Sequence, residues 1–346
     1  MVQCVAATWG RPRKTQGEQT LDVEAVHAIA PAARILYVGA TNCLGGVDLA
    51  LSKVLDNKLA NIVSNSYSST EYDSRHDFKR EVNLQLQAIG EGIGLYYANG
   101  DDGDNSLILG HPSANFSDSS PWVTAVGGTS LAIDKNGRRS WETGWGDQAD
   151  LIVKNAQGGL EFDSPLPGPA EGFFGGAGGG PSAVFTEPDY QRGVVPQSLS
   201  EGLRVSSDIA ALADPFIGFQ VGLRPIINDD TLETGGYTTS VTGGTSLATP
   251  IVAAHIALAQ QATGTAVGFA NPALYALNRV LPGAFQDILP QQNPPQAVVR
   301  TNPLTGHTFF VTFDQDLGLK TAKGYDPVTG LGSVSLDLLK RVAGSH

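Results

Sequence analysis

The sequence predicts an α/β protein in which helices flank a parallel central sheet on both faces. Three short apolar segments have the length and composition of buried strands, at residues 35–38, 62–66 and 93–98. Three segments with helical spacing of apolar residues lie before or between them, at residues 21–30, 47–55 and 78–89. Strands that alternate with helices of this length are joined by right-handed crossovers, so the strands are expected to run parallel.

Further along the chain we expect a strand, a hairpin and one long helix. The strand is predicted at residues 122–126, and the residues on either side of Asn136-Gly137 are typical of a β-hairpin. The longest apolar helix begins after Ser246. Residues 155–181 are rich in glycine and proline. This composition has two explanations: the segment is a linker between domains, or it is a stretch where the backbone must approach a ligand closely.

Composition limits the classes of function. A chain of 346 residues, 41% of them apolar, is long enough for one large core, and we expect a single domain over residues 1–346. The net charge of -12, with only 22 Lys and Arg spread along the chain, argues against a nucleic-acid partner. No apolar run reaches the roughly 18 residues of a membrane span. Cys4 and Cys43 are the only cysteines; whether they pair is open, and neither has zinc-site spacing.

Ser246 has two interpretations at this point. It follows Gly243-Gly244-Thr245 at the start of the apolar helix, and helix capping alone explains a serine there. The two glycines also permit a sharp turn that sets the hydroxyl at a helix N-terminus, where free amides stabilise a developing oxyanion. The Gly-x-Ser-x-Gly elbow of α/β-hydrolases does not fit, because Ala248 stands at the second glycine.

Gly-Thr-Ser246 followed by Ala248 and Pro250 resembles the nucleophile motif of subtilisin-like serine peptidases. None of the six histidines is followed by Gly-Thr, the setting of the subtilisin base. Asp101 stands where subtilisins carry an oxyanion-hole asparagine. Both departures are those of the sedolisins, the serine-carboxyl peptidases, which the sequence resembles from about Gly17 to the C-terminus. The resemblance implies a subtilisin-like fold.

The resemblance also implies a catalytic set. Glu18 and Asp22, four residues apart on one helix face, match the Glu-x-x-x-Asp pair of the family. Glu18 would take the proton of Ser246, Asp22 would orient Glu18, and a protonated Asp101 would donate to the oxyanion. Asp102 is a rival to Asp101, but the Gly-Asp-x-Gly register favours Asp101. Carboxyl groups that share a proton suit an acidic medium. In isolation these acids would be an ordinary helix face and a turn.

One calcium ion near the C-terminus, in loops at about residues 285–333, is a further implication of the resemblance. The implied ligands are the side chains of Asp287 and Asp326 and the carbonyls of Ile288, Ala322 and Gly324. Oxygen ligands with only two carboxylates suit Ca²⁺. Without the family these residues would form ordinary turns.

The resemblance further implies that an extended peptide binds by β-augmentation, and the implied contacts are Ser66, Tyr67 and Gly179. Ser66-Tyr67-Ser68 departs here from the Ser-Trp-Gly of the family. We expect an acid-acting endopeptidase or tripeptidyl-peptidase with polypeptide substrates, secreted in its complete form and a monomer. The family also implies a pro-domain and a first strand and helix before this chain, so the catalytic domain is expected to be N-terminally incomplete. The alternative is an inactive, calcium-stabilised scaffold that binds peptides.

Overall fold

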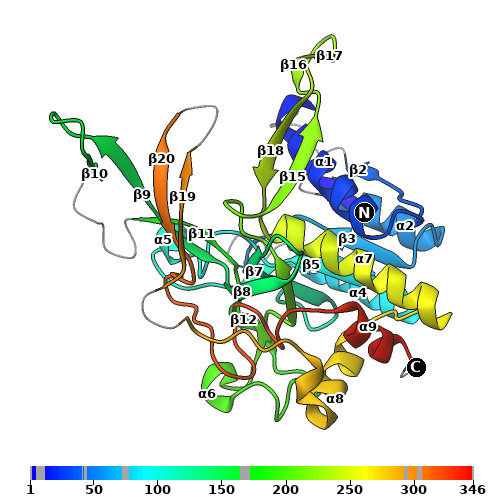
Figure 1. The fold of residues 1–346 in the computed structure, drawn as a ribbon. Helices are drawn as coiled ribbons and strands as arrows, with labels where there is room; N and C mark the ends of the chain where they lie inside the picture. Colours follow the sequence, from blue (N-terminus) through cyan, green and yellow to red (C-terminus); the bar gives the residue numbers. More distant parts are fainter. Residues whose placement is uncertain are drawn as a thin grey trace.

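A seven-stranded sheet lies at the centre of the computed structural model, which describes residues 2–4, 12–40, 42, 45–71, 78–163, 172–291, 295–301 and 306–344 (Figure 1). The strand order is β14-β7-β5-β3-β1-β2, and β8 pairs with β7. The strands are β1 (Val2–Cys4), β2 (Val38–Ala40), β3 (Ile62–Asn65), β5 (Gly94–Ala98), β7 (Thr124–Ile133), β8 (Arg139–Gly144) and β14 (Ile209–Leu212). All pairs except β7–β8 are parallel, which confirms the predicted fold class.

Helices cover both faces of this sheet. On one face α1 (Pro12–Ile29), α7 (Thr245–Thr263), α8 (Asn271–Val280) and α9 (Leu336–Ala343) share one apolar core. On the other, α2 (Gly46–Asp56) and α4 (Phe78–Gly90) enclose a second core. Short helices are α5 (Ser106–Leu109), α6 (Gln197–Ser200) and the 3₁₀ turn η1 (Pro282–Ala284). Along the part of the chain that is described, no helix has the length and apolarity to cross a membrane.

Two predicted elements differ from the structure. The strand expected at residues 35–38 lies too early, because β2 begins at Val38. Helix α1 begins at Pro12, well before the residue 21 that apolar spacing indicated. Its polar first half is held by tertiary contacts. Gln16 Nε2 donates to the carbonyl of Arg224 (2.8 Å), and the amide of Ile226 donates to Gln16 Oε1 (2.8 Å).

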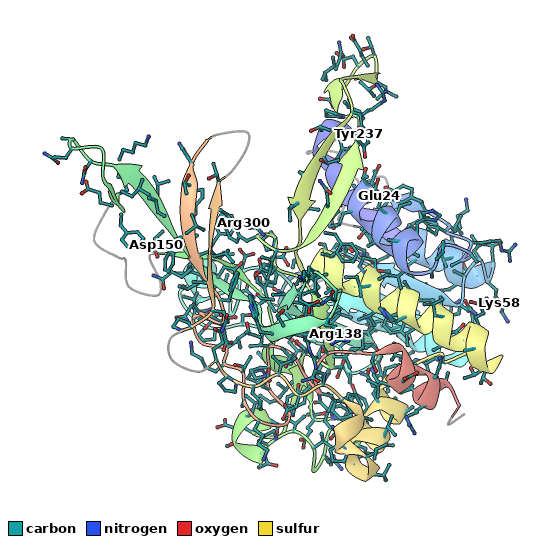
Figure 2. The ribbon with its side chains drawn as sticks, viewed as in Figure 1. Glu24, Lys58, Arg138, Asp150, Tyr237 and Arg300 are labelled. Atoms are coloured by element: carbon teal, nitrogen blue, oxygen red, sulfur yellow. The ribbon has the colours of Figure 1, made fainter. Side chains whose placement is uncertain are left out.

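Two β projections rise from the sheet in the same direction (Figure 1). One contains β9 (Gly146–Lys154), β10 (Leu160–Phe162), β11 (Phe173–Gly176), β19 (Ala297–Thr301) and β20 (Thr308–Thr312). The other contains β15 (Phe219–Leu223), β16 (Ile226–Asn228), β17 (Glu233–Thr234) and β18 (Thr238–Thr242). Figure 2 marks Arg300 on the first and Tyr237, 67% exposed, on the second. The remaining strands are β4 (Ser69–Thr70), β6 (Asn115–Phe116), β12 (Gly180–Thr186) and β13 (Leu203–Ser206).

The glycine-rich stretch is part of the fold where it is described. Strand β11 pairs with β9, and the amide of Gly178 donates to the carbonyl of Gly100 (2.9 Å). The linker interpretation is therefore wrong for residues 172–181. Residues 164–171 and Cys43 lie outside the described residues. Whether Cys4 and Cys43 pair therefore stays open.

Candidate active site

Ser246 is the second residue of α7, and the helix cap is Gly244. The capping interpretation of Ser246 is therefore wrong. Gly244 has φ of 102°, and its amide donates to the carbonyl of Ala213 (2.5 Å). A Cβ at Gly244 would lie 2.7 Å from Asp101 Oδ2, so glycine is needed both for the turn and for the approach of Asp101. The Ser246 side chain is left available at the N-terminus of the helix.

Glu18 and Asp22 lie on α1, which packs beside α7. Burial raises the pKa of Glu18 to about 7; the nearby Ser246 side chain opposes this rise, and the charge of Asp101 adds to it. The side chains of Glu18 and Ser246 therefore lie close to each other. Burial, and next the charge of Glu18, raise the pKa of Asp22 well above its usual value. The structure thus brings the two predicted carboxyl groups and the predicted nucleophile together.

One oxygen of each carboxyl group, Glu18 Oε1 and Asp22 Oδ2, is buried without a hydrogen-bond donor among the described residues. Burying two ionised carboxylates side by side is costly, and a proton on either one lowers that cost. Ser66 Oγ supports the pair from β3's end: it lies 2.8 Å from Asp22 Oδ1 and 3.3 Å from the carbonyl of Ser246. The structure thus places two buried carboxyl groups near the Ser246 loop.

Asp101 follows β5 and meets the first turn of α7. Its Oδ1 accepts from the amide and from the hydroxyl of Thr245, both at 2.8 Å. The residue is exposed to solvent on one side, yet its carboxyl group is enclosed by protein and burial raises its pKa. Its backbone carbonyl accepts from the amide of Gly176 (3.0 Å). Asp101, rather than Asp102, is therefore the aspartate held against the Ser246 loop.

Sequence reasoning missed the part played by Thr245. It sits inside the Gly-Thr-Ser motif, and that position was the available signal. Through its amide and hydroxyl it fixes Asp101 to the residue next to Ser246.

The three predicted substrate contacts lie in different settings. Ser66 belongs to the carboxyl cluster, as its bond to Asp22 shows. The Tyr67 ring stands edge-on to Tyr97, with 5.7 Å between centroids, and its hydroxyl is buried. Gly179 is buried, and a Cβ there would lie 2.1 Å from the carbonyl oxygen of Pro327. Their roles in substrate binding stay predictions.

The predicted calcium ligands converge on one loop. Both oxygens of Asp287 accept from the amide of Gly324, at 3.1 Å each. Asp326 is 1% exposed, and burial raises its pKa to about 7. No described backbone amide donates to the carbonyls of Ile288, Ala322 or Gly324. Within the described ranges no three His, Cys, Asp or Glu side chains gather as a metal cluster, so a metal here would rest mainly on carbonyls. Free carbonyls and two carboxylates fit a hard cation such as Ca²⁺.

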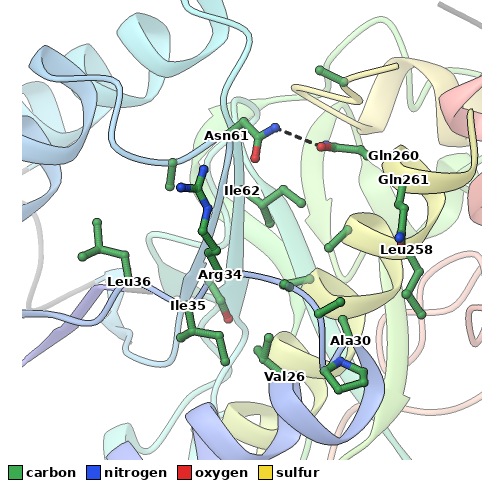
Figure 3. Close-up of a pocket in the computed structure, with 18 of the residues that line it drawn as sticks. Val26, Ala30, Arg34, Ile35, Leu36, Asn61, Ile62, Leu258, Gln260 and Gln261 are labelled. Carbon is green, nitrogen blue, oxygen red and sulfur yellow. Dashed lines mark hydrogen bonds between the residues drawn. The ribbon is translucent and has the colours of Figure 1, made fainter. Parts of the chain in front are cut away.

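A cavity of about 1140 Å³ lies away from this cluster (Figure 3). Its walls are the end of α1, residues 30–36 and 59–64, and the C-terminal half of α7. Asn61 Nδ2 donates to Gln260 Oε1 (3.0 Å) across its rim. None of Glu18, Asp22 and Ser246 lines it. The catalytic candidates therefore do not belong to this cavity.

Three features define the class of subtilisin-like serine peptidases. They are a parallel sheet, a serine in the first turn of a central helix, here Ser246, and polar side chains that face this serine from a neighbouring helix and strand end, here Glu18 and Asp101. The chain belongs to the subtilase family, whose sequence model matches residues 9–274.

Within that class the chain is similar to sedolisin-type enzymes. Kumamolisin of Bacillus sp. (strain MN-32) is 30% identical over 332 residues, which cover 94% of this chain and 50% of that protein. The tripeptidyl-peptidase sed5 of Aspergillus fumigatus is 28% identical, over 80% of this chain and 43% of that protein. The solved structure of Pseudomonas sedolisin, a serine-carboxyl proteinase complexed with two molecules of pseudo-iodotyrostatin, has a TM-score of 0.72 at 23% identity, covering 96% and 80% of the two chains.

These comparisons confirm the sedolisin resemblance and the subtilisin-like fold. The chain spans about half the length of the curated relatives it matches. Several of these relatives are peptidases or proteinases by name.

Proposed function

We propose that this chain is the catalytic portion of a serine-carboxyl peptidase that hydrolyses peptide bonds in acid. The observation that carries the proposal is the placement of Glu18 and Asp22 beside Ser246, with Ser66 Oγ 2.8 Å from Asp22 Oδ1 and 3.3 Å from the Ser246 carbonyl. Ser246 attacks the scissile carbonyl carbon while its proton passes to the Glu18–Asp22 pair, and the same proton then goes to the amine as the C–N bond breaks. Water then attacks the resulting ester of Ser246 and gives a proton to the pair, and this proton returns to Ser246 as the carboxylic acid product leaves. Asp101, in its protonated form, donates a hydrogen bond to the oxyanion.

Acid action follows from the protonation that each group needs. With one proton shared, the Glu18–Asp22 pair has one negative charge and can accept the proton of Ser246. As pH rises, the pair loses its remaining proton and Asp101 ionises, so the oxyanion loses its donor. Below the pH at which the pair takes up its second proton it is no longer a base. The pH profile is therefore expected to be bell-shaped.

The experiment is hydrolysis of a denatured protein at about pH 4, with Ser246→Ala and Glu18→Gln as the variants. General-base loss lowers kcat by roughly 10²- to 10⁴-fold. A Ser246→Ala variant that cleaves as fast as the parent contradicts the proposal.

The alternative is a peptide-binding scaffold of the same fold. It binds a peptide aldehyde without forming a covalent adduct, whereas the peptidase forms a hemiacetal on Ser246 that mass spectrometry detects. Glu18 placed against Ser246 favours the peptidase.

The proposal includes a Ca²⁺ ion held by Asp287 and Asp326 with the carbonyls of Ile288, Ala322 and Gly324. It is supported by the convergence of these residues and by their free carbonyls. Chelation is expected to lower the melting temperature of the parent and not that of Asp287→Ala. An unchanged melt of the parent after chelation contradicts the site.

We further propose that the substrates are polypeptides and that the enzyme is secreted and monomeric. We also propose that a longer precursor contains a pro-domain. These proposals rest on the similarity to sedolisin-type peptidases.

A further inference from the structure

Two buried polar side chains outside the catalytic cluster lie in the segments behind Asp101. Asn99 directly follows β5, two positions before Asp101, and Ser207 stands between β13 and β14. Both are fully buried. Asn99 Nδ2 donates to Ser207 Oγ (2.5 Å), so the two side chains join segments that are 108 positions apart. The Asn99 Oδ1 atom has no donor among the described residues, so the bonds of Nδ2 are those that hold this side chain.

The second partner of Asn99 is the backbone of the glycine-rich segment. Nδ2 also donates to the carbonyl of Gly178 (2.6 Å). A carbonyl only accepts, and this fixes the orientation of the Asn99 amide group. The amide of Gly178 donates in turn to the carbonyl of Gly100 (2.9 Å), so residues 99 and 100 bind both polar backbone groups of Gly178. A Cβ at residue 178 would lie 1.9 Å from the carbonyl oxygen of Asn99, and this close approach therefore requires glycine.

This contact lies between two groups that the proposed reaction needs. Gly179, the residue after Gly178, is a predicted substrate contact, and Asp101 is the proposed donor to the oxyanion. On the other side of Gly178, the amide of Gly176 donates to the carbonyl of Asp101 (3.0 Å). The segment predicted to receive the substrate is therefore bound to the Asp101 loop at both ends, and a shift of one moves the other.

Ser207 extends these hydrogen bonds to a loop near the C-terminus, at residues 326–330. Its Oγ lies 3.1 Å from the carbonyl oxygen of Val328 and 3.2 Å from that of Pro327. Because Oγ already accepts from Asn99, its single proton points to these carbonyls. The same loop also touches Gly179 directly, since a Cβ there would lie 2.1 Å from the carbonyl oxygen of Pro327. The loop thus supports the glycine-rich segment both by packing and through Ser207.

We propose that Asn99 and Ser207 are positioning residues that hold Gly178 and the Asp101 loop in place by anchoring them to loop 326–330. This role deepens the proposed peptidase function and rests on it for its effect on catalysis. Without Asn99, no other donor in the described part of the chain reaches the carbonyl of Gly178. A buried carbonyl without a donor is costly, so the segment is expected to shift. Without Ser207, the Asn99 side chain loses the contact that links it to the loop.

A double-mutant cycle tests whether the two side chains act as one unit, with Ca²⁺ in every sample. Asn99→Ala is expected to lower kcat and raise KM, with a loss of about tenfold in kcat/KM, because it releases both the Asp101 loop and the segment predicted to bind substrate. Ser207→Ala is expected to lower kcat/KM several-fold in the parent and to have little further effect in Asn99→Ala. Losses that multiply in the double variant overturn the proposal.

Ser120→Ala is the matched control for Ser207→Ala. Ser120 is also fully buried, and its hydroxyl donates to Gln85 Oε1 (2.5 Å), on α4 at the second face of the sheet. The control thus removes a buried hydroxyl donor that bonds neither the Asp101 loop nor the glycine-rich segment. It is expected to leave kcat and KM unchanged, and an equal loss in Ser120→Ala and Ser207→Ala contradicts a specific role of Ser207.

Hydrogen exchange separates this inference from the proposed function, because it needs no cleavage. In a Ser246→Ala background, Ser207→Ala is expected to raise the exchange of amides 176–178, although the Ser207 hydroxyl bonds none of them. Parental exchange in Ser207→Ala overturns the positioning role, whether or not the chain cleaves peptides. Raised exchange in a chain that does not cleave supports the anchor and contradicts the proposed function alone.

A reciprocal measurement covers the case in which Ser207→Ala does not fold. Asn99→Ala is then compared with the parent in the same Ser246→Ala background. The exchange of amides 328–331 is expected to rise, because Ser207 loses the donor that orients its proton toward this loop. Parental exchange of these amides in Asn99→Ala overturns the proposal.

Discussion

Asp316→Asn is predicted to stabilise the fold near neutral pH. Asp316 is almost fully buried beside Gly103, Gly146 and Gly176. Its Oδ1 accepts from the amide of Leu317 (2.6 Å), while its Oδ2 has no donor in the described ranges. Burial raises its pKa from 3.8 to about 8; the Leu317 amide and Lys320 oppose this rise, and Asp104 adds to it. The folded protein therefore holds a proton on Asp316 that the unfolded chain releases above about pH 4.

This difference sets the sign and size of the effect. A group with a raised folded pKa gives stability that is complete below the unfolded pKa and lost as pH rises to the folded one. Each pH unit in that window lowers the free energy of unfolding by about 1.4 kcal/mol. From pH 4 to pH 6 the loss attributable to Asp316 is about 3 kcal/mol. Asparagine does not titrate, so Asp316→Asn is expected to retain most of this amount at pH 6.

Urea denaturation followed by tryptophan fluorescence measures the effect, in a Ser246→Ala background that prevents self-cleavage. The free energies of unfolding of parent and variant are expected to be similar at pH 4 and to diverge as pH rises. Asp230→Asn, an exposed aspartate at the tip of the β15–β18 projection, is the control and is expected to follow the parent. A variant less stable than the parent at pH 7 would refute the reasoning, since it would mean that ionised Asp316 is stabilised by Lys320.

Three further predictions concern single contacts. Ser66→Ala removes the donor to Asp22 that favours its ionised form, so the acid limb of kcat/KM is expected to move to higher pH, by about one unit or less; an unmoved limb contradicts this. Gly244→Ala is expected to lower kcat at least tenfold, because the added Cβ would collide with Asp101. Gly264 also has a positive φ but has open space around it, so Gly264→Ala is expected to leave kcat unchanged. Equal losses of kcat in the two variants contradict the steric argument. Arg204→Met is expected to lower the free energy of unfolding by about 3 to 5 kcal/mol, because it leaves the buried Asp208 without its cation. Urea titrations measure this loss, and a value below about 1 kcal/mol contradicts the prediction.

The central fold was predictable because its elements carry local signals. The strands that became β3 and β5 are short apolar runs, and both helices on the second face show helical spacing of apolar residues. The two β projections carry no such signal. Strand β19 is exposed on both faces, so its residues show no alternation, and β18 is exposed along almost its full length. Their pairing depends on residues far away in the chain, as in the β9–β20 ladder.

The candidate catalytic residues could be found because a family motif fixes each of them locally. Nothing comparable marks Asp316, which looks like a loop acid in the sequence. Its burial beside Gly103, Gly146 and Gly176 appears only when β9, β11 and the segment after β20 are brought together. The first half of α1 was missed for a similar reason. It is stabilised by bonds from Gln16 to residues near the β15–β16 connection and not by its own apolar residues.

In the proposed mechanism, the dependence on acid involves other buried carboxyl groups besides the catalytic base. Glu18 and Asp101 come from a helix and from the end of a strand, yet burial raises the pKa of each. Burial without a cation favours the neutral carboxyl group at both positions. In the proposed mechanism, exchange of the base for a group that works at neutral pH would therefore still leave an ionised Asp101 facing the oxyanion. Activity at neutral pH would then require a change at Asp101 as well as at Glu18.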